Sequence, residues 1–207
     1  MKILLGTRNK GKFHDIHAAL SDLPVKILSP DELNIAEDPA ETGETFEENA
    51  LLKAQFYHAQ SGLPTIADDS GLVVEALEGE MGVKTRRWGA GPTVSDDEWV
   101  AFFLRRMERE TNKRALFVST VAFLNADGTH HVFYGECQGL ITDKLESAFP
   151  PGLPLQGCFK PQGFDQVYGN LTEAQRNTVN HRHQAVMRLK WHLKHMQQLI
   201  AAQNREQ

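Results

Sequence analysis

The stretch Thr65-Ile66-Ala67-Asp68-Asp69-Ser70-Gly71-Leu72-Val73-Val74 places two adjacent carboxylates between two apolar runs. This pattern predicts a strand, an acidic turn and a second strand. Adjacent carboxylates repel each other, so they need water, hydrogen-bond donors or a cation beside them, and a divalent metal would serve all three purposes. Asp, Ser and Gly are also ordinary turn residues. On its own, the stretch fits both a solvated turn and part of a metal site.

The composition is that of a globular chain with one sizeable core. The 207 residues are 41% hydrophobic and 24% charged, and domains usually have roughly 100–200 residues, so we expect one domain or two tightly joined lobes. Every apolar run is much shorter than the roughly 20 residues of a membrane span. The segment Met1–Thr7 is too short in its apolar part for a signal peptide. We therefore expect a cytoplasmic protein without a membrane partner.

The charge and the cysteines exclude two further classes. A formal net charge of −5 argues against a general nucleic-acid binder, which would carry a basic face. Cys137 and Cys158 lie in different segments without the spacing of a zinc site or a disulfide framework, so both are expected to be buried free thiols.

Apolar periodicity and helix-start signals give the order of elements. Capping boxes at Thr45–Glu48, Ser95–Glu98 and Thr172–Gln175 each predict the start of a helix. A turn near Asn125–Gly128 between two alternating runs predicts a β-hairpin. Residues 149–163 are rich in Pro and Gly and are expected to form a loop that lines a pocket. Together these signals predict an α/β fold with a mixed sheet.

Two basic segments are candidates for anion binding. Arg8-Asn9-Lys10-Gly11-Lys12 connects the first strand to the first helix, where free backbone N–H groups attract phosphate. Its spacing is not that of a P-loop, so a solvated basic turn also fits. His181 and Arg182 begin the last helix, where cations oppose the helix dipole; ligand binding would explain them, and so would chance.

Four blocks in order along the chain resemble one family closely. They are Thr7-x-Asn9-x-Gly11-Lys12, Glu41-Thr42-Gly43-x-Thr45-Phe46-x-Glu48-Asn49-Ala50-x-x-Lys53-Ala54, Ala67-Asp68-Asp69-Ser70-Gly71-Leu72, and Leu171-Thr172 with His181-Arg182-x-Gln184-Ala185. The chain resembles the inosine triphosphatase family of non-standard purine nucleoside-triphosphate pyrophosphatases (XTP/dITP diphosphatases). The resemblance implies one domain over residues 1–207 with a mixed central sheet, two lobes around an active-site cleft, and a homodimer.

The resemblance also implies a reaction and a set of site residues. The reaction is Mg²⁺-dependent hydrolysis of ITP, dITP or XTP to the monophosphate and pyrophosphate. Glu41 and Asp69 would hold the Mg²⁺, Asp69 would also accept a proton from the attacking water, and Lys12, Lys53 and Asp68 would assist. The residues expected to bind the substrate are Thr7, Arg8, Asn9, Lys10, Gly11, Lys12, Ser70, Gln162, Gly163, Phe164, Asp165, Arg176, His181 and Arg182.

Elementary chemistry agrees with these roles. Phosphoryl transfer requires a carboxylate-bound metal, a positioned water and cations on the departing group. A keto oxygen at the purine 6-position accepts hydrogen bonds, so donors such as His181 and Arg182 would favour inosine- or xanthosine-type bases.

The departures from the family pattern affect the base pocket more than the metal site. Gln162-Gly163-Phe164-Asp165-Gln166 stands where a Phe-Gly-Tyr-Asp-Pro run is usual, Arg176 replaces a lysine, Asp15 a glutamate and His183 a glycine. Loss of a stacking aromatic side chain costs roughly 1–3 kcal/mol per base. A pyrophosphatase for another modified nucleotide, or a nucleotide-binding regulator without turnover, are the alternatives.

Overall fold

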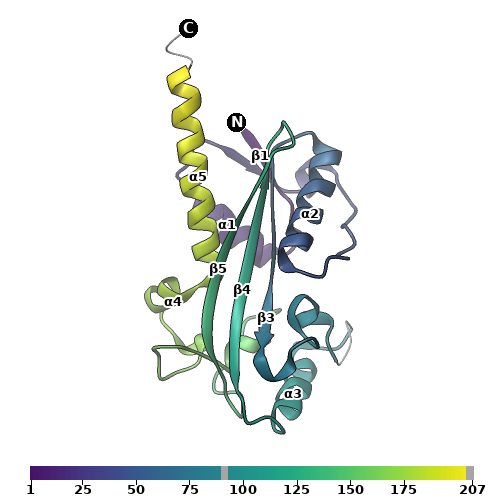
Figure 1. Ribbon diagram of the computed structural model, residues 1–207, viewed down its shortest axis with the longest axis vertical. Helices are drawn as coiled ribbons and strands as arrows, with labels where there is room; N and C mark the ends of the chain where they lie inside the picture. Colours follow the sequence, from purple (N-terminus) through teal and green to yellow (C-terminus); the bar gives the residue numbers. More distant parts are fainter. Residues whose placement is uncertain (90–92, 204–207) are drawn as a thin grey trace. The chain divides into compact units, whose positions relative to one another are not determined.

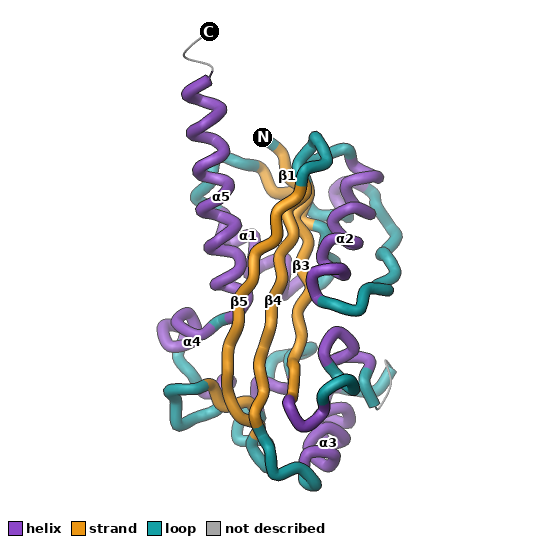
Figure 2. The backbone as a smooth tube through the Cα atoms, viewed as in Figure 1, coloured by secondary structure: helices purple, strands orange, loops and turns teal. Residues whose placement is uncertain are grey.

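The computed structural model describes residues 1–89 and 93–203. Strands and helices alternate over the first half of the chain, after which three strands and then two α-helices follow one another (Figures 1 and 2). They are β1 (Lys2–Leu5), α1 (Lys10–Leu20), β2 (Lys26–Leu28), α2 (Phe46–Ser61), β3 (Thr65–Val74), α3 (Asp96–Met107), β4 (Arg114–Leu124), β5 (His130–Ile141), β6 (Phe159–Pro161), α4 (Glu173–Val179) and α5 (His181–Gln203). None of the helices in these described ranges combines the length and the apolar character needed to cross a membrane.

The strands form one six-stranded sheet in the order β2-β1-β3-β4-β5-β6. β1 pairs in parallel with both β2 and β3, whereas β6 runs antiparallel to β5, with Ile141 opposite Phe159. The sheet is therefore mixed, and the predicted α/β class is confirmed. The hairpin is confirmed as well: Gly128, at φ 85°, closes the turn between β4 and β5 by donating its N–H to Asn125 O over 3.1 Å.

The chain divides into two compact units, and β3, β4 and β5 contribute residues to both. Unit 1 comprises Met1–Asp69, Ser119–Gly135 and Arg182–Gln207, and unit 2 comprises Ser70–Val118 and Glu136–His181. The predicted domain bounds of 1–207 include residues 90–92 and 204–207, which lie outside the described residues.

In unit 1, alternate residues of each strand pack against different helices. Ile66 of β3 belongs to an apolar cluster with α1 and α5, whereas its neighbour Ala67 belongs to a second cluster with α2. Val121 and Ala122 of β4 divide in the same way. Successive side chains of a strand point to opposite faces, so α1 and α5 cover one face of these strands and α2 covers the other (Figure 1).

The core of unit 2 is built around α3. Trp99, Phe103 and Met107 are buried, and the Trp99 and Phe103 rings stack at 5.6 Å between centroids. These residues recur at helical spacing, so one face of α3 packs into the core of unit 2. Cys137 and Cys158 are also buried free thiols here, and burial raises their pKa to about 11 and about 12.

Local capping chemistry starts several helices. Thr45, Ser95 and Thr172 each form a complete capping box with the residue three positions on, which confirms all three predicted starts. Asn9 caps α1 by accepting a hydrogen bond from the Lys12 N–H at 3.0 Å. The first turn of α1 is thereby fixed next to the strand that precedes it.

Two expectations about local structure were wrong. The Asp68-Asp69 pair does not form a turn, because β3 runs without interruption from Thr65 to Val74. Residues 149–163 are not entirely loop, since they contain a short 3₁₀ helix, Pro154–Gly157, and the strand β6. A three-residue strand ending in proline leaves no periodic signal in the sequence, so only its pairing with β5 reveals it.

Candidate active site

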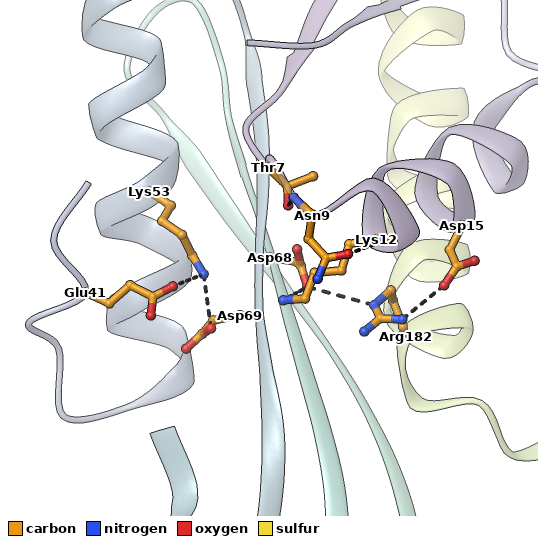
Figure 3. Close-up of polar contacts among 9 residues, drawn as sticks. All are labelled: Thr7, Asn9, Lys12, Asp15, Glu41, Lys53, Asp68, Asp69 and Arg182. Atoms are coloured by element: carbon orange, nitrogen blue, oxygen red, sulfur yellow. Dashed lines mark hydrogen bonds and ion pairs between the residues drawn. The ribbon is translucent and has the colours of Figure 1, made fainter. Parts of the chain in front are cut away.

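The continuous strand β3 sends its two carboxylates to opposite faces of the sheet. Asp68 follows Ile66 by two residues and lies on the side of α1 and α5, whereas Asp69 follows Ala67 by two and lies on the side of α2. Figure 3 shows Asp68 turned toward Lys12 and Arg182, and Asp69 turned toward Lys53. The repulsion expected between adjacent carboxylates is thus reduced by the strand geometry itself.

Asp68 forms a buried cluster with two cations from distant parts of the chain. Its Oδ2 lies 2.8 Å from Lys12 Nζ of α1 and 3.9 Å from Arg182 Nε of α5. Arg182 also donates from Nη1 to Asp15 Oδ2 over 3.1 Å. Burial alone would raise the pKa of the Asp68 carboxyl, but Lys12, Arg182 and Lys53 together lower it below its usual value. Asp68 is therefore a stably ionised partner of these cations.

Asp69 shares a lysine with Glu41. Lys53 Nζ donates to Glu41 Oε1 over 2.8 Å and to Asp69 Oδ1 over 3.0 Å. Asp69 Oδ2 is buried, and no donor in the described part of the chain forms a hydrogen bond to it. Burial raises the pKa of the Asp69 carboxyl despite the nearby Lys53 and Lys12. This face of β3 therefore carries a carboxylate oxygen with capacity to bind another group.

The chemistry of the Glu41–Lys53–Asp69 cluster fits a magnesium ion. Carboxylate oxygens are hard ligands, and Mg²⁺ commonly uses one or two of them together with substrate phosphates and water. Within the described ranges, no group of three or more His, Cys, Asp or Glu side chains is arranged to hold a metal ion. Two carboxylates suit an ion that binds together with a nucleotide, and the unsatisfied Asp69 Oδ2 supplies an acceptor for it.

The segment Thr7–Lys12 lies at the N-terminus of α1, as the sequence predicts. Thr7 Oγ1 accepts from the Asn9 N–H at 3.3 Å, and the Asn9 side chain caps the helix. The side chain of Lys12 reaches Asp68, whereas Arg8 turns away from it and donates to Ile35 O over 2.9 Å. Binding of phosphate by this segment stays a prediction.

The other residues predicted to bind the substrate belong to unit 2, except Arg182. Gln162 N donates to Gln138 O, Gly163 adopts φ 87°, and Phe164 packs against the unit 2 core. Ser70 is half-buried in β3, Asp165 follows Phe164, and Arg176 lies in the last turn of α4. Arg182 instead joins the Asp68 cluster of unit 1.

His181 has an aromatic partner that the sequence pattern does not predict. The His181 ring stacks on Phe117 of β4, with centroids 5.0 Å apart and an interplanar angle of 9°. Phe117 also contacts Phe159 at 4.5 Å between centroids. Phe117 lies in an ordinary apolar strand pattern, so no local signal distinguishes it; the stacking depends on a partner that is distant in the chain.

The fold and these clusters define an α/β protein in which buried carboxylates are paired with lysines and an arginine, a combination suited to a metal-bound polyphosphate. Comparison with known proteins then gives the family: the Ham1 family model matches residues 3–192, and the chain belongs to this family.

Individual relatives agree with this assignment. The dITP/XTP pyrophosphatase of Haemophilus influenzae is 38% identical over 199 residues, which cover 91% of this chain and 97% of the relative. The dITP/XTP pyrophosphatase of Leptospira interrogans is 33% identical over 185 residues, which cover 89% of this chain and 93% of the relative. These names confirm the family expected from the sequence blocks.

Solved structures show the same fold. The Ham1 protein of Staphylococcus aureus superposes with a TM-score of 0.84 at 31% identity, covering 95% of this chain and 100% of that one. A HAM1 protein of Coxiella burnetii superposes with a TM-score of 0.86 at 29% identity, covering 94% of this chain and 99% of that one.

Proposed function

We propose that this protein is a nucleoside-triphosphate pyrophosphatase that hydrolyses deaminated purine nucleotides such as ITP, dITP and XTP. Its relatives carry the name dITP/XTP pyrophosphatase at 31–38% identity over most of the chain. The observation that carries the proposal is the placement of Asp68 and Asp69 on opposite faces of β3, each with its own lysine. This arrangement separates a structural ion pair from a carboxylate that can take part in chemistry.

The residues of unit 1 divide the work of the reaction. Water attacks the α-phosphorus, the bond from that phosphorus to the α–β bridging oxygen breaks, and the monophosphate and pyrophosphate separate. Asp69 accepts the proton of the attacking water. Glu41 and Asp69 hold Mg²⁺, which neutralises phosphate charge when bound. Lys53 keeps these two carboxylates side by side.

Lys12 and the N-terminus of α1 bind the phosphates in this proposal. The free N–H groups of the first turn and the helix dipole favour an anion there, and Lys12 adds a cation that Asp68 holds in place. Thr7, Arg8, Asn9, Lys10 and Gly11 belong to this phosphate segment.

The residues of unit 2 select the base. His181 and, from unit 1, Arg182 are donors that favour a keto oxygen over the amino group of adenine. Ser70, Gln162, Gly163, Phe164, Asp165 and Arg176 complete the proposed nucleotide-binding set. Gln162 replaces an aromatic residue of the family pattern, so we expect weaker discrimination among bases than stacking would give.

A substrate panel tests the proposal. Purified protein with Mg²⁺ is expected to release pyrophosphate from ITP, dITP and XTP, with much lower activity on ATP and GTP and none after EDTA treatment. Release from a modified pyrimidine triphosphate alone would indicate another base. Binding of these nucleotides without any pyrophosphate release would identify a regulator and overturn the proposal.

Three broader properties are part of the same proposal. The family resemblance supports a homodimer and one catalytic domain formed from both units, and we also expect a cytoplasmic location. Light scattering on the purified protein tests the first, and cell fractionation tests the last. A single cooperative unfolding transition, followed by both tryptophan fluorescence and circular dichroism, is expected for one domain.

A further inference from the structure

Helix α2 offers three polar side chains, one helical turn apart, to the chain segment that carries Glu41. We call residues 35–43 the Glu41 loop. Asn49 Oδ1 accepts from Gly43 N at 2.8 Å, Lys53 donates to Glu41 at 2.8 Å, and Tyr57 OH donates to Asp38 Oδ1 at 2.5 Å. Residues four apart lie on one face of a helix. The loop therefore runs antiparallel to α2 and is held at three levels, with Glu41 at the middle one.

Two of the three anchors are deeply buried. Asn49 is fully buried, and Tyr57 is 1% exposed, packed with Leu4 and Ile35. A Cβ atom at Gly43 would lie 2.7 Å from Glu48 Cβ, so only glycine allows the loop to approach α2 this closely. The ends of the Glu41 loop are thus fixed by packing as well as by hydrogen bonds.

The anchor at Tyr57 also includes the phosphate segment. Arg8 donates to Ile35 O over 2.9 Å, and its Nε lies 3.7 Å from the same Asp38 oxygen that Tyr57 binds. A Cβ atom at Gly6 would lie 2.4 Å from Tyr57 Cδ2, so the ring rests directly on the backbone that leads to Thr7. Burial and the Asp38 carboxylate raise the pKa of Tyr57, so its hydroxyl keeps the proton it donates.

We propose that Tyr57 is a positioning residue that, through Asp38, fixes the Glu41 loop so that Glu41 can bind the metal. The metal part of this inference rests on the proposed function, whereas the anchoring of the loop is independent of it. The Tyr57 hydroxyl bonds Asp38, whereas Lys53, one helical turn earlier in α2, bonds Glu41 and Asp69.

The test compares Tyr57→Phe with Tyr134→Phe. Both remove one tyrosine hydroxyl that donates to a carboxylate of unit 1, but the partner of Tyr134 is Glu47, which lies outside the Glu41 loop. Asp38→Asn is a second variant that weakens the same bond from the other side and leaves the Tyr57 ring in place.

The first readout is hydrogen exchange of residues 36–43 without metal or nucleotide. The second is binding of Mn²⁺ alone, as a probe of the metal site, by titration calorimetry. The third is the Mg²⁺ concentration that gives half-maximal pyrophosphate release.

In Tyr57→Phe and Asp38→Asn, we expect faster hydrogen exchange of the Glu41 loop and Mn²⁺ affinity that is about three- to tenfold weaker. The Mg²⁺ concentration needed for half-maximal activity should rise by the same factor. These changes correspond to the loss of one hydrogen bond to a partly exposed charge. The kcat at saturating Mg²⁺ should stay near that of the wild type, and Tyr134→Phe should behave as the wild type throughout.

Unchanged hydrogen exchange of residues 36–43 in both Tyr57→Phe and Asp38→Asn would overturn the inference. Faster exchange with unchanged Mn²⁺ affinity would overturn it as well. If the wild type binds Mn²⁺ and releases no pyrophosphate, the proposed function fails, while exchange and Mn²⁺ affinity still decide the role of Tyr57.

Discussion

The two faces of β3 show how neighbouring residues of the same type acquire different properties. On the face of α1 and α5, Asp68 is fully buried between Lys12 and Arg182, and its pKa is lowered. On the face of α2, Asp69 pairs with Lys53, and its pKa is raised because burial outweighs the effect of the nearby cations. The difference arises from the cations that each face supplies, since the strand itself treats both residues alike. We infer that Asp68 serves mainly stability and that Asp69 serves chemistry.

Asp69→Asn should produce the largest effect of the variants, a loss of kcat. A smaller effect would contradict the different roles assigned to the two faces of β3. Loss of the proton acceptor and of one metal ligand is expected to lower kcat by at least about 10²–10⁴-fold. The melting temperature should stay the same or rise, because burial disfavours the ionised form of this carboxylate. Steady-state kinetics and thermal unfolding measure the two quantities. A variant with near-normal kcat would remove Asp69 from the mechanism.

Asp68→Asn should instead lower stability. It leaves Lys12 and Arg182 beside a neutral group, although their side chains are only 19% and 10% exposed. Removing one member of a buried ion pair costs about 3–5 kcal/mol of unfolding free energy. Urea denaturation, with Asp69→Asn as the matched control, measures this loss. Equal unfolding free energies for the two variants would contradict the division between the faces.

The pH dependence of stability sharpens the comparison further. The pKa of Asp68 is lower in the folded state than its ordinary value of 3.8, so its stabilisation is present above that pH and is lost as the pH falls through the folded pKa. The stability difference between the wild type and Asp68→Asn should therefore shrink below about pH 4.

The opposite sign applies to Asp69. Its folded pKa is raised, so its favourable contribution is present below pH 3.8 and is lost as the pH rises through the folded value. Asp69→Asn should gain stability relative to the wild type as the pH rises above about 4. Urea midpoints from pH 3 to pH 7 in EDTA measure both trends, and two trends of the same sign would refute the assignment.

Asp15→Asn should have the smallest effect. Asp15 pairs with the same Arg182 as Asp68 does, but its side chain is 51% exposed. Exposed ion pairs contribute less than about 1 kcal/mol. The urea midpoint should therefore barely change. A loss as large as that of Asp68→Asn would show that Asp15 is the main partner of Arg182.

Local chemistry was predictable from the sequence, and long-range pairing was not. The Thr45–Glu48 capping box involves residues three apart, so the pattern itself contains the interaction. The Asp68-Asp69 pair was misread as a turn because its partners, Lys12 and Lys53, belong to separate helices that no spacing rule connects to β3. Lys53 pairs with Glu41 and Asp69, and neither partner lies at a spacing from Lys53 that a local pattern would reveal.

The site residues followed from family resemblance rather than from physical pattern. The family resemblance assigns Glu41 and Asp69 as metal ligands, but it does not explain what fixes the conformation of the loop that carries Glu41. Tyr57 and Phe117 stayed unnoticed because their partners, Asp38 and His181, are visible only in the folded chain.

The three hydrogen bonds between α2 and the Glu41 loop restrict the length of that loop. Surface connections usually accept added residues at little cost. Here Asn49, Lys53 and Tyr57 lie about 6 Å apart along the helix axis, because each is four residues from the next. An added residue between Asp38 and Gly43 would shift Glu41 away from the level of Lys53. The pitch of a neighbouring helix thus sets how many residues this irregular segment can contain.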